Sequence, residues 1–101
     1  MVAFSQRVVV PPHVLVRQLD GESVLLNLET EIYYGLDATG TRMWELLTSS
    51  PSLETACGIL AHEFEVDPEI LRNHLSELVG QLVEKGLLNV LPADVGSIPA
   101  V

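Results

Sequence analysis

Apolar and polar residues alternate along the first third of the chain, and this alternation predicts three β-strands. Two of these segments, Val14–Leu19 and Val24–Leu28, flank Asp20-Gly21, a dipeptide typical of the two-residue turn of a β-hairpin. The third segment, Ile32–Leu36, follows after a short loop. The pattern therefore predicts a three-stranded antiparallel meander. In its first strand, Val14 with Val16 and Leu15 with Leu19 fit the buried face equally well.

The loop between the second and third strands decides which side chains face the core, because a shift of one residue turns every side chain to the opposite face. A two-residue loop would pair Leu28 with Glu31 and would turn the apolar set of the third strand away from the core. A loop over 29–31 keeps one face apolar and places Glu31 in a left-handed conformation, where glycine would cost roughly 1 kcal/mol less. We therefore expect these pairs: Leu28 with Ile32, Leu26 with Tyr34, and Val24 with Leu36.

Apolar residues at helical spacing predict three helices in the remainder of the chain. Asp37 can cap a first helix that ends at about Leu47. Either Ser50-Pro51 or Ser52 can open a second helix that ends at about Phe64. Each of the two helices carries an apolar stripe that can cover the sheet or the other helices.

The third predicted helix has the strongest start signal in the chain. Asp67-Pro68-Glu69 combines an N-cap residue, a proline at the first helical position and an acidic residue in the first turn. The helix ends at Gly86, after which 87–91 can form a short final strand. Its apolar stripe consists of Leu71, Leu75, Leu78, Val79 and Leu82.

The order of these elements predicts an α+β fold that is winged helix-turn-helix-like, with a three-stranded antiparallel sheet followed by three helices. We expect one domain over 13–91, preceded by an N-terminal arm over 1–12 and followed by a mobile C-terminal tail over 92–101. The chain of 101 residues has 48% apolar residues, which is enough for a packed core.

The charge balance restricts the partners of the chain. Five basic residues stand against 14 acidic ones, a net charge of −9 that disfavours nucleic acids and anionic membranes. A winged-helix DNA-binding regulator remains an alternative of a different class, although the third predicted helix has four acidic and two basic residues over 67–85. No apolar segment is long enough to span a bilayer, and the first residues do not form a signal peptide, so we expect a cytoplasmic protein.

The residues that could carry catalysis are scattered. The three histidines, His13, His62 and His74, belong to three different predicted elements. Cys57, the single cysteine, excludes an internal disulfide and fits an apolar helix stripe better than a nucleophile. A metal site of His62 with Glu63 and Glu65 competes with ordinary exposed helix-end residues, which explain the same pattern. We expect no enzyme, no cofactor and no metal.

The third predicted strand has an edge without the usual protection. Ile32–Leu36 contains no proline, lysine or arginine, whereas Pro11-Pro12 precedes the first strand. Such an edge is either covered by the chain's own helix or open to an added strand from a partner. Tyr33 and Tyr34 point to opposite faces, and Tyr34 can equally be a core residue with Tyr33 as a surface aromatic. The same edge allows a domain-swapped dimer, although we expect a monomer.

The stretch 24–47, VLLNLETEIYYGLDATGTRMWELL, resembles the PqqD family, and so do the Asp-Pro-initiated helix and its EKGLL end. The similarity covers about 14–90. The family comprises leader-peptide recognition elements for ribosomally made peptide natural products. One position departs from it, because the family often has glycine where Glu31 stands.

The resemblance implies that a precursor's leader peptide adds as a strand along Ile32–Leu36, in a groove beside the third helix. Apolar residues of both elements would line pockets for leader side chains, with Tyr33 and Arg72 at the rim, and the acidic residues Glu31 and Glu69 would suit a basic leader. The same leucines can equally be pure core. The expected peptide-binding residues are Glu31, Ile32, Tyr33, Tyr34, Gly35, Leu71, Arg72, His74, Leu75 and Leu78.

The resemblance also implies the kind of protein that works with this chain. A stand-alone member would be a non-catalytic adaptor that presents the leader to a separate leader peptidase or cyclase, as in lasso-peptide biosynthesis. The alternative within the family is a peptide chaperone for a radical enzyme in quinone-cofactor biosynthesis.

Overall fold

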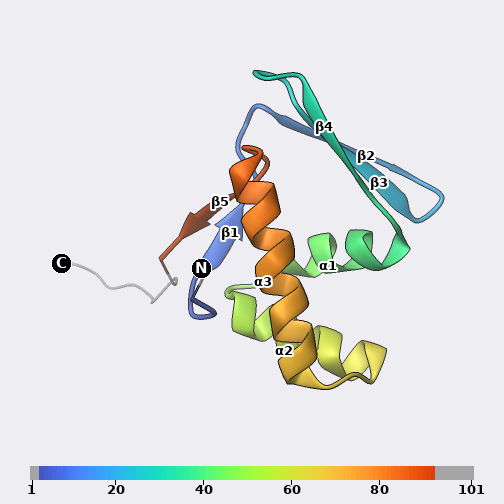
Figure 1. Cartoon of the computed structure of the whole chain (residues 1–101), viewed down its shortest axis with the longest axis vertical. Helices are drawn as coiled ribbons and strands as arrows, with labels where there is room; N and C mark the ends of the chain where they lie inside the picture. The colour runs from blue at the N-terminus through green and yellow to red at the C-terminus, as the bar shows by residue number, and fades with distance from the viewer. Residues whose placement is uncertain (1–2, 93–101) are drawn as a thin grey trace.

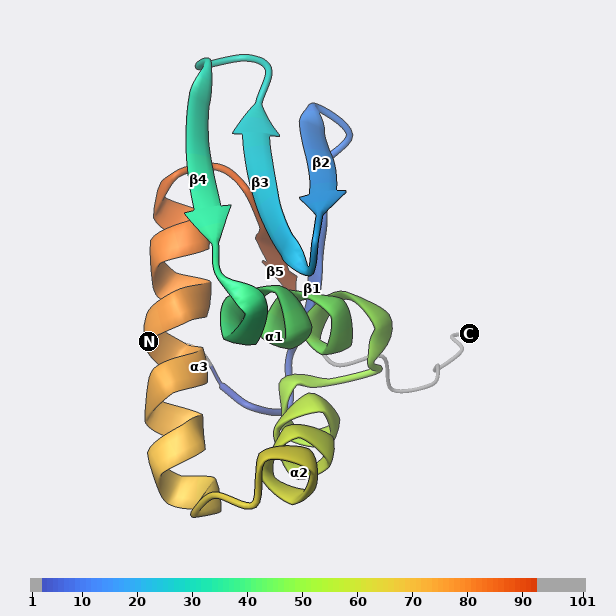
Figure 2. The same cartoon turned by 90° about the vertical axis from the view of Figure 1, so that its right-hand side faces the viewer.

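The computed structural model describes residues 3–92, so the expected C-terminal tail lies outside the described residues from position 93 onward. The elements follow in the order β1 (Arg7–Val9), β2 (Val14–Leu19), β3 (Glu22–Asn27), β4 (Ile32–Leu36), α1 (Ala38–Ser49), α2 (Leu53–Phe64), α3 (Pro68–Glu84) and β5 (Asn89–Leu91). Strands β2, β3 and β4 form a three-stranded antiparallel sheet in that order, and β1 pairs with β5. The sheet stands at one end of the molecule and the helices lie beside and below it (Figures 1 and 2). The predicted α+β fold is confirmed.

The first hairpin forms as its turn residues predict. Asp20 and Gly21 both have positive φ, at 54° and 82°, and the two-residue loop closes the pair Leu19 and Glu22. The sequence left the inward face of β2 open. In the structure Val14 and Val16 pack against the core, whereas Leu15 and Leu19 are exposed.

The predicted register of the second hairpin is wrong by one residue. The structure pairs Asn27 with Ile32, Leu25 with Tyr34 and Ser23 with Leu36, so the loop has four residues, 28–31. Glu31 nevertheless has the expected left-handed conformation, with φ at 62°. The prediction failed because it assumed that the inward face of β3 would be apolar throughout, and two of its inward residues are polar.

The two polar residues on the inward face of β3, Ser23 and Asn27, can be buried because other parts of the fold provide their hydrogen-bond partners. The Nδ2 of Asn27 donates to the carbonyl oxygens of Lys85 and Gly86, both at 3.2 Å. Its Oδ1 accepts from two loop amides, at 2.9 and 3.2 Å. The hydroxyls of Ser23 and Thr41 lie 2.7 Å apart. Asn27 thus joins the β3–β4 hairpin to the end of α3.

The helix starts are confirmed. The side-chain oxygens of Asp37, Ser52 and Asp67 each accept a hydrogen bond from a backbone amide in the first turn of α1, α2 and α3. α1 extends two residues beyond the predicted end. Leu residues of all three helices meet under the sheet with Leu25 and Leu36, and Trp44 is buried among them.

The N-terminal segment takes part in the fold more closely than an arm would. β1 pairs along its length with β5, which realises the predicted final strand, and Val8 is buried in the core. The carbonyl oxygens of Gln6 and Phe4 accept hydrogen bonds from the amides of Leu53 and Glu54 at the start of α2. These bonds satisfy amides that a helix leaves without partners in its first turn.

Candidate functional site

The free edge of the three-stranded sheet is the feature around which the candidate site is built. β4 pairs with β3 on one side only, so alternate backbone N–H and C=O groups on its other side point away from the sheet. No proline, lysine or arginine interrupts this edge. In Figure 2 only the C-terminal end of α3 comes level with β4, so the open edge borders the end of a helix.

A side-chain bridge holds β4 against α3. The hydroxyl of Tyr34 donates to the Oε1 of Gln81 at 2.5 Å. Next to this bond, a hollow of about 290 Å³ lies between β4, the start of α1 and α3. Its lining includes Tyr34, Gly35, Leu36, Met43 and Leu78. The hollow is large enough to receive an apolar side chain of a peptide bound at the edge.

The predicted strand residues divide between the two faces of the sheet. Ile32 and Tyr34 lie on the face toward α3, and Tyr33 and Gly35 lie on the opposite face. Ile32 is 43% exposed and Tyr33 is 73% exposed, so both are accessible along the edge. Glu31 is exposed in the hairpin loop. The five predicted residues of 31–35 thus all lie on or next to the free edge, but they are divided between its two faces and the loop.

The predicted residues of α3 separate into core and surface. Leu71 and Leu75 are buried in the hydrophobic core, as the competing interpretation of these leucines held. Leu78 is half-buried and lines the hollow beside Tyr34. His74 is exposed four residues before it, on the same side of the helix.

Arg72 lies apart from the edge. Its guanidinium carbon is 4.2 Å from the centre of the Phe4 ring, so this side chain covers the N-terminal segment. On α3, two positions separate it from His74, which places the two side chains on different sides of the helix. The structure does not bring Arg72 together with β4.

Sequence reasoning missed Gln81. This residue follows Leu78 by three positions and therefore shares its side of α3, which is a signal that helical periodicity could have supplied. Glu77 and Glu84 stand four positions before and three positions after Gln81, so they border the same side. Together with Glu31 in the β3–β4 loop and Asp37 beside the hollow, these glutamates place negative charge around the groove between β4 and α3.

Two titratable groups away from this edge, Glu63 and Cys57, have shifted pKa values that their structural surroundings explain. Glu63 receives two hydrogen bonds of 2.8 Å from Arg42, and this pairing lowers the pKa of the Glu63 carboxyl. Cys57 is buried in the core, as expected, and this burial raises the pKa of its thiol. Within residues 3–92, no three His, Cys, Asp or Glu side chains gather as metal ligands would. None of the helices in that range has the length and apolar character needed to cross a membrane.

The arrangement suits the binding of an extended peptide. The edge offers backbone hydrogen bonds, the hollow offers an apolar contact, and the surrounding carboxylates favour a basic ligand. Comparison with known proteins finds a family that contains this site. The family described as "Coenzyme PQQ synthesis protein D (PqqD)" matches residues 22–88, a range that includes β3, β4 and all three helices.

Two solved structures share the fold. One, "TbiB1 in Complex with the TbiA(beta) Leader Peptide", is 34% identical, with a TM-score of 0.72 over 79% of this chain and 93% of that one. The other, "Lasso peptide synthetase B1 complexed with the leader peptide", is 26% identical, with a TM-score of 0.69 over 84% of this chain and 98% of that one. No curated protein sequence gives a significant match.

Proposed function

Because this chain belongs to the PqqD family, we propose that it binds the leader peptide of a ribosomally synthesised precursor by strand addition at β4. The observation that carries the proposal is the open edge of β4, which lies beside α3 and has no residue that would block pairing. The two similar structures support it, since both are complexes with leader peptides.

The edge and the groove would contribute differently to binding. Main-chain hydrogen bonds with β4 would supply affinity that does not depend on the leader sequence. Side chains at alternate leader positions would point toward α3, where Ile32, Tyr34 and Leu78 offer apolar contact. The acidic residues Glu31 and Glu77 would favour leaders that carry Lys or Arg. Only the leader side chains on this side of the added strand would then determine which leader sequences bind.

The chain would act as an adaptor between the precursor and a separate maturation enzyme. Holding the leader raises the effective concentration of the attached core peptide for an enzyme that binds the adaptor. The similarity to a lasso peptide synthetase B1 favours a leader peptidase or a cyclase of lasso-peptide biosynthesis as that enzyme. The family description favours the second candidate, a peptide chaperone in the synthesis of a quinone cofactor.

The first test is fluorescence anisotropy with labelled leader peptides from precursor genes next to the gene of this chain. We expect sub-micromolar binding to one leader. N-methyl groups placed one at a time on successive leader amides should weaken binding at every second position, because only alternate amides of an added strand bond to β4. Equal effects at all positions, or no effect at any, would contradict strand addition.

Proline variants test the same bonds from the protein side. Residues 33 and 34 are consecutive, so one of their amides points to the free edge and the other to β3. Of Tyr33→Pro and Tyr34→Pro, one should lose leader binding while its unfolding midpoint stays near that of the wild type. If both variants fold and bind as the wild type does, the model is refuted. A duplex DNA ligand is the control, and salt-sensitive binding to it would instead favour a regulator.

A further inference from the structure

The side of α3 that borders β4 continues past the end of the sheet. Gln81 marks this side, because its side chain bonds to Tyr34. Glu77, His74 and Ile70 precede Gln81 by about one, two and three turns of the helix, so they share its side. In Figure 2 the helix extends well beyond the end of β4 and reaches the level of α2. We refer to Ile70, His74 and Glu77 together as the α3 extension.

The α3 extension is exposed although it contains a large apolar residue. Ile70 is 55% exposed, whereas the next residue of the helix, Leu71, is buried in the core. His74 and Glu77 are exposed as well. Val66, which precedes the helix, is 41% exposed and gives the same end of α3 a second apolar side chain. The fold therefore leaves an apolar contact uncovered about three turns from the groove.

The charges of α3 favour a basic ligand on this side. Residues 67–84 include four acidic side chains, and Arg72 is their single Lys or Arg. Arg72 stands two positions from Ile70 and therefore on the opposite side of the helix, where its guanidinium carbon lies 4.2 Å from the centre of the Phe4 ring. Glu77 thus lies on a side of α3 that carries no Lys or Arg within 67–84. A ligand segment that carries Lys or Arg would complement the extension.

The dimensions of the extension favour an extended chain as its ligand. Between Gln81 and Ile70 the helix rises by about 16 Å and offers one row of side chains. A stable protein–protein interface needs roughly 800 Å² on each partner, which one row of side chains does not supply. A second copy of this chain would also bring a net charge of −9 against these carboxylates. An extended peptide spans the same distance with about five residues.

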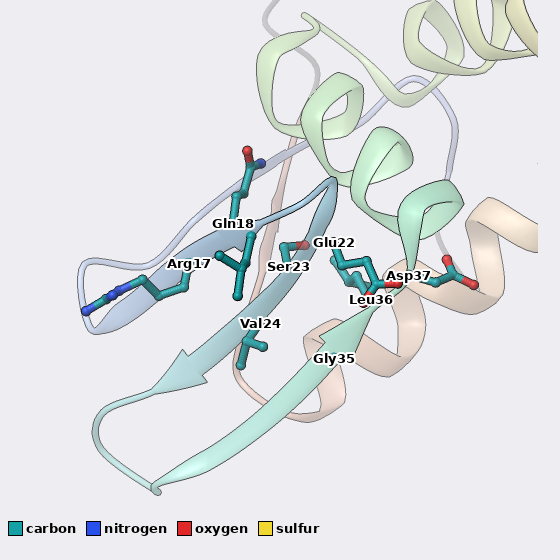
Figure 3. A pocket seen from close by; sticks show the side chains of 9 residues that line it. Arg17, Gln18, Glu22, Ser23, Val24, Gly35, Leu36 and Asp37 are labelled. Carbon is teal, nitrogen blue, oxygen red and sulfur yellow. The ribbon is translucent and has the colours of Figure 1, made fainter.

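A larger hollow, of about 550 Å³, does not continue the groove (Figure 3). Its lining includes Val24 and Gly35, which are paired across β3 and β4 on the face of the sheet opposite to Tyr34. A peptide at the free edge would have to cross from one face of the sheet to the other to enter this hollow. The α3 extension lies on the face of Tyr34, so a peptide reaches it without such a crossing.

We propose that the leader segment that leaves β4 at its Leu36 end runs along the α3 extension. A Lys or Arg of this segment would lie beside Glu77, and an apolar side chain about five residues beyond the strand would contact Ile70. This inference rests on the proposed function, because the strand bound at β4 brings the segment to α3 at a high effective concentration. The extension would allow the chain to distinguish leaders whose strand segments are alike.

The test uses the full chain and the leader peptide, encoded beside its gene, that binds it. This leader is compared at full length and after shortening, from either end, to the segment that N-methylation assigns to β4. Ile70→Ser removes the apolar contact, and Glu77→Lys reverses the charge beside the leader. Fluorescence anisotropy gives the affinity of each protein for each peptide, and urea unfolding checks that every variant is folded.

Two matched controls change the same residue types elsewhere. Ile59→Ser is the first, because Ile59 is 44% exposed and shares the side of α2 on which Glu63 bonds to Arg42 of α1. Glu22→Lys is the second, because Glu22 is exposed and lines the larger hollow. If Glu22→Lys lowers leader affinity and Glu77→Lys does not, the segment passes the hollow and the inference is refuted.

For the full-length leader, we expect Ile70→Ser to weaken binding by about fivefold and Glu77→Lys by about threefold or more, with both controls within about twofold of the wild type. Shortening the leader at the end that passes α3 should weaken wild-type binding as well, and both variants should then bind the shortened peptide as the wild type does. If the variants bind the full-length leader as the wild type does, or lose the same factor with both shortened peptides, this inference alone is refuted. Failure of the wild type to bind any leader would refute the proposed function and this inference with it.

Discussion

Replacing Asn27 with alanine should destabilise the domain by about 2–4 kcal/mol. Asn27 is buried, and its side chain makes four hydrogen bonds. The two bonds to the carbonyls of Lys85 and Gly86 are partly buried and should contribute ~1–3 kcal/mol together. The two bonds to the amides of Glu29 and Thr30 are also partly buried, but they reach a loop whose residues are exposed, so water can replace part of their contribution and we expect ~1 kcal/mol from them.

Urea unfolding followed by the fluorescence of Trp44 measures this change, because Trp44 is the single tryptophan and is buried. Asn73→Ala is the matched control, since Asn73 is exposed on α3 and its loss should alter stability by less than about 0.5 kcal/mol. A second variant, Asn27→Asp, distinguishes the bonds that Asn27 accepts from the loop amides from those that it donates to the carbonyls of Lys85 and Gly86. Its carboxylate would still accept from the loop amides but would face the carbonyls of Lys85 and Gly86.

The aspartate variant should therefore be least stable at neutral pH. Repulsion by the two carbonyls would raise the pKa of Asp at this position in the folded state, so stability should be regained as the pH falls through that raised pKa, and fully so below its pKa in the unfolded chain. If Asn27→Ala unfolds at the same urea concentration as Asn73→Ala, the explanation of the register through Asn27 is refuted. If it is destabilised as expected, its leader affinity should also fall, because the hairpin that carries β4 is held to α3 less firmly, by the Tyr34–Gln81 bond without Asn27.

Further predictions concern the groove and the core. Leu75→Ala should lower the free energy of unfolding by about 2–5 kcal/mol, measured in urea, because Leu75 is fully buried. Leu78→Ala should lower it less and should mainly weaken leader binding, measured by anisotropy. The opposite result would reverse the assignment of the two leucines to core and groove. Glu31→Gly should raise the unfolding free energy by about 0.5–1 kcal/mol, since φ at this position is positive, and an unchanged urea midpoint would argue against strain there. Burial raises the pKa of Cys57, so stability should decline as the pH rises past the ordinary thiol pKa, and the folded protein should react with iodoacetamide more slowly than the chain in urea. Equal alkylation rates would mean that the thiol is accessible.

Local signals in the sequence were sufficient for the elements but not for their pairing. Asp20-Gly21 and Asp67-Pro68 specify a turn and a helix start through backbone preferences that act within a few residues. The register of β4 depends on Asn27, whose partners at Lys85 and Gly86 lie at the far end of the chain. An amide in a strand looks like a solvent-facing residue until such partners are known, so the apolar pattern selected the wrong face.

The candidate site could be predicted in part for the same reason. The absence of blocking residues on the edge strand is a property of the sequence, but whether the chain's own helix covers that edge is decided only by the packing. Which leucines of α3 reach the groove depends on how the helix is rotated about its axis relative to the sheet. The sequence does not give this rotation, whereas the bond between Tyr34 and Gln81 in the structure shows it. The N-terminal strand was missed because three residues before a pair of prolines carry too little periodicity to indicate a strand.

The pairing of β1 with β5 has a consequence for the time course of folding. Val8 and Val90 are partners although almost the whole length of the chain separates them, whereas the β2–β3 and β3–β4 hairpins join neighbouring segments. Closing so long a loop is slow compared with closing a hairpin. During synthesis on the ribosome, β1 emerges before β2, β3 and β4 and has no strand to pair with until β5 has followed them. The pairing of β1 with β5 therefore closes the domain late, after the β4 edge has formed.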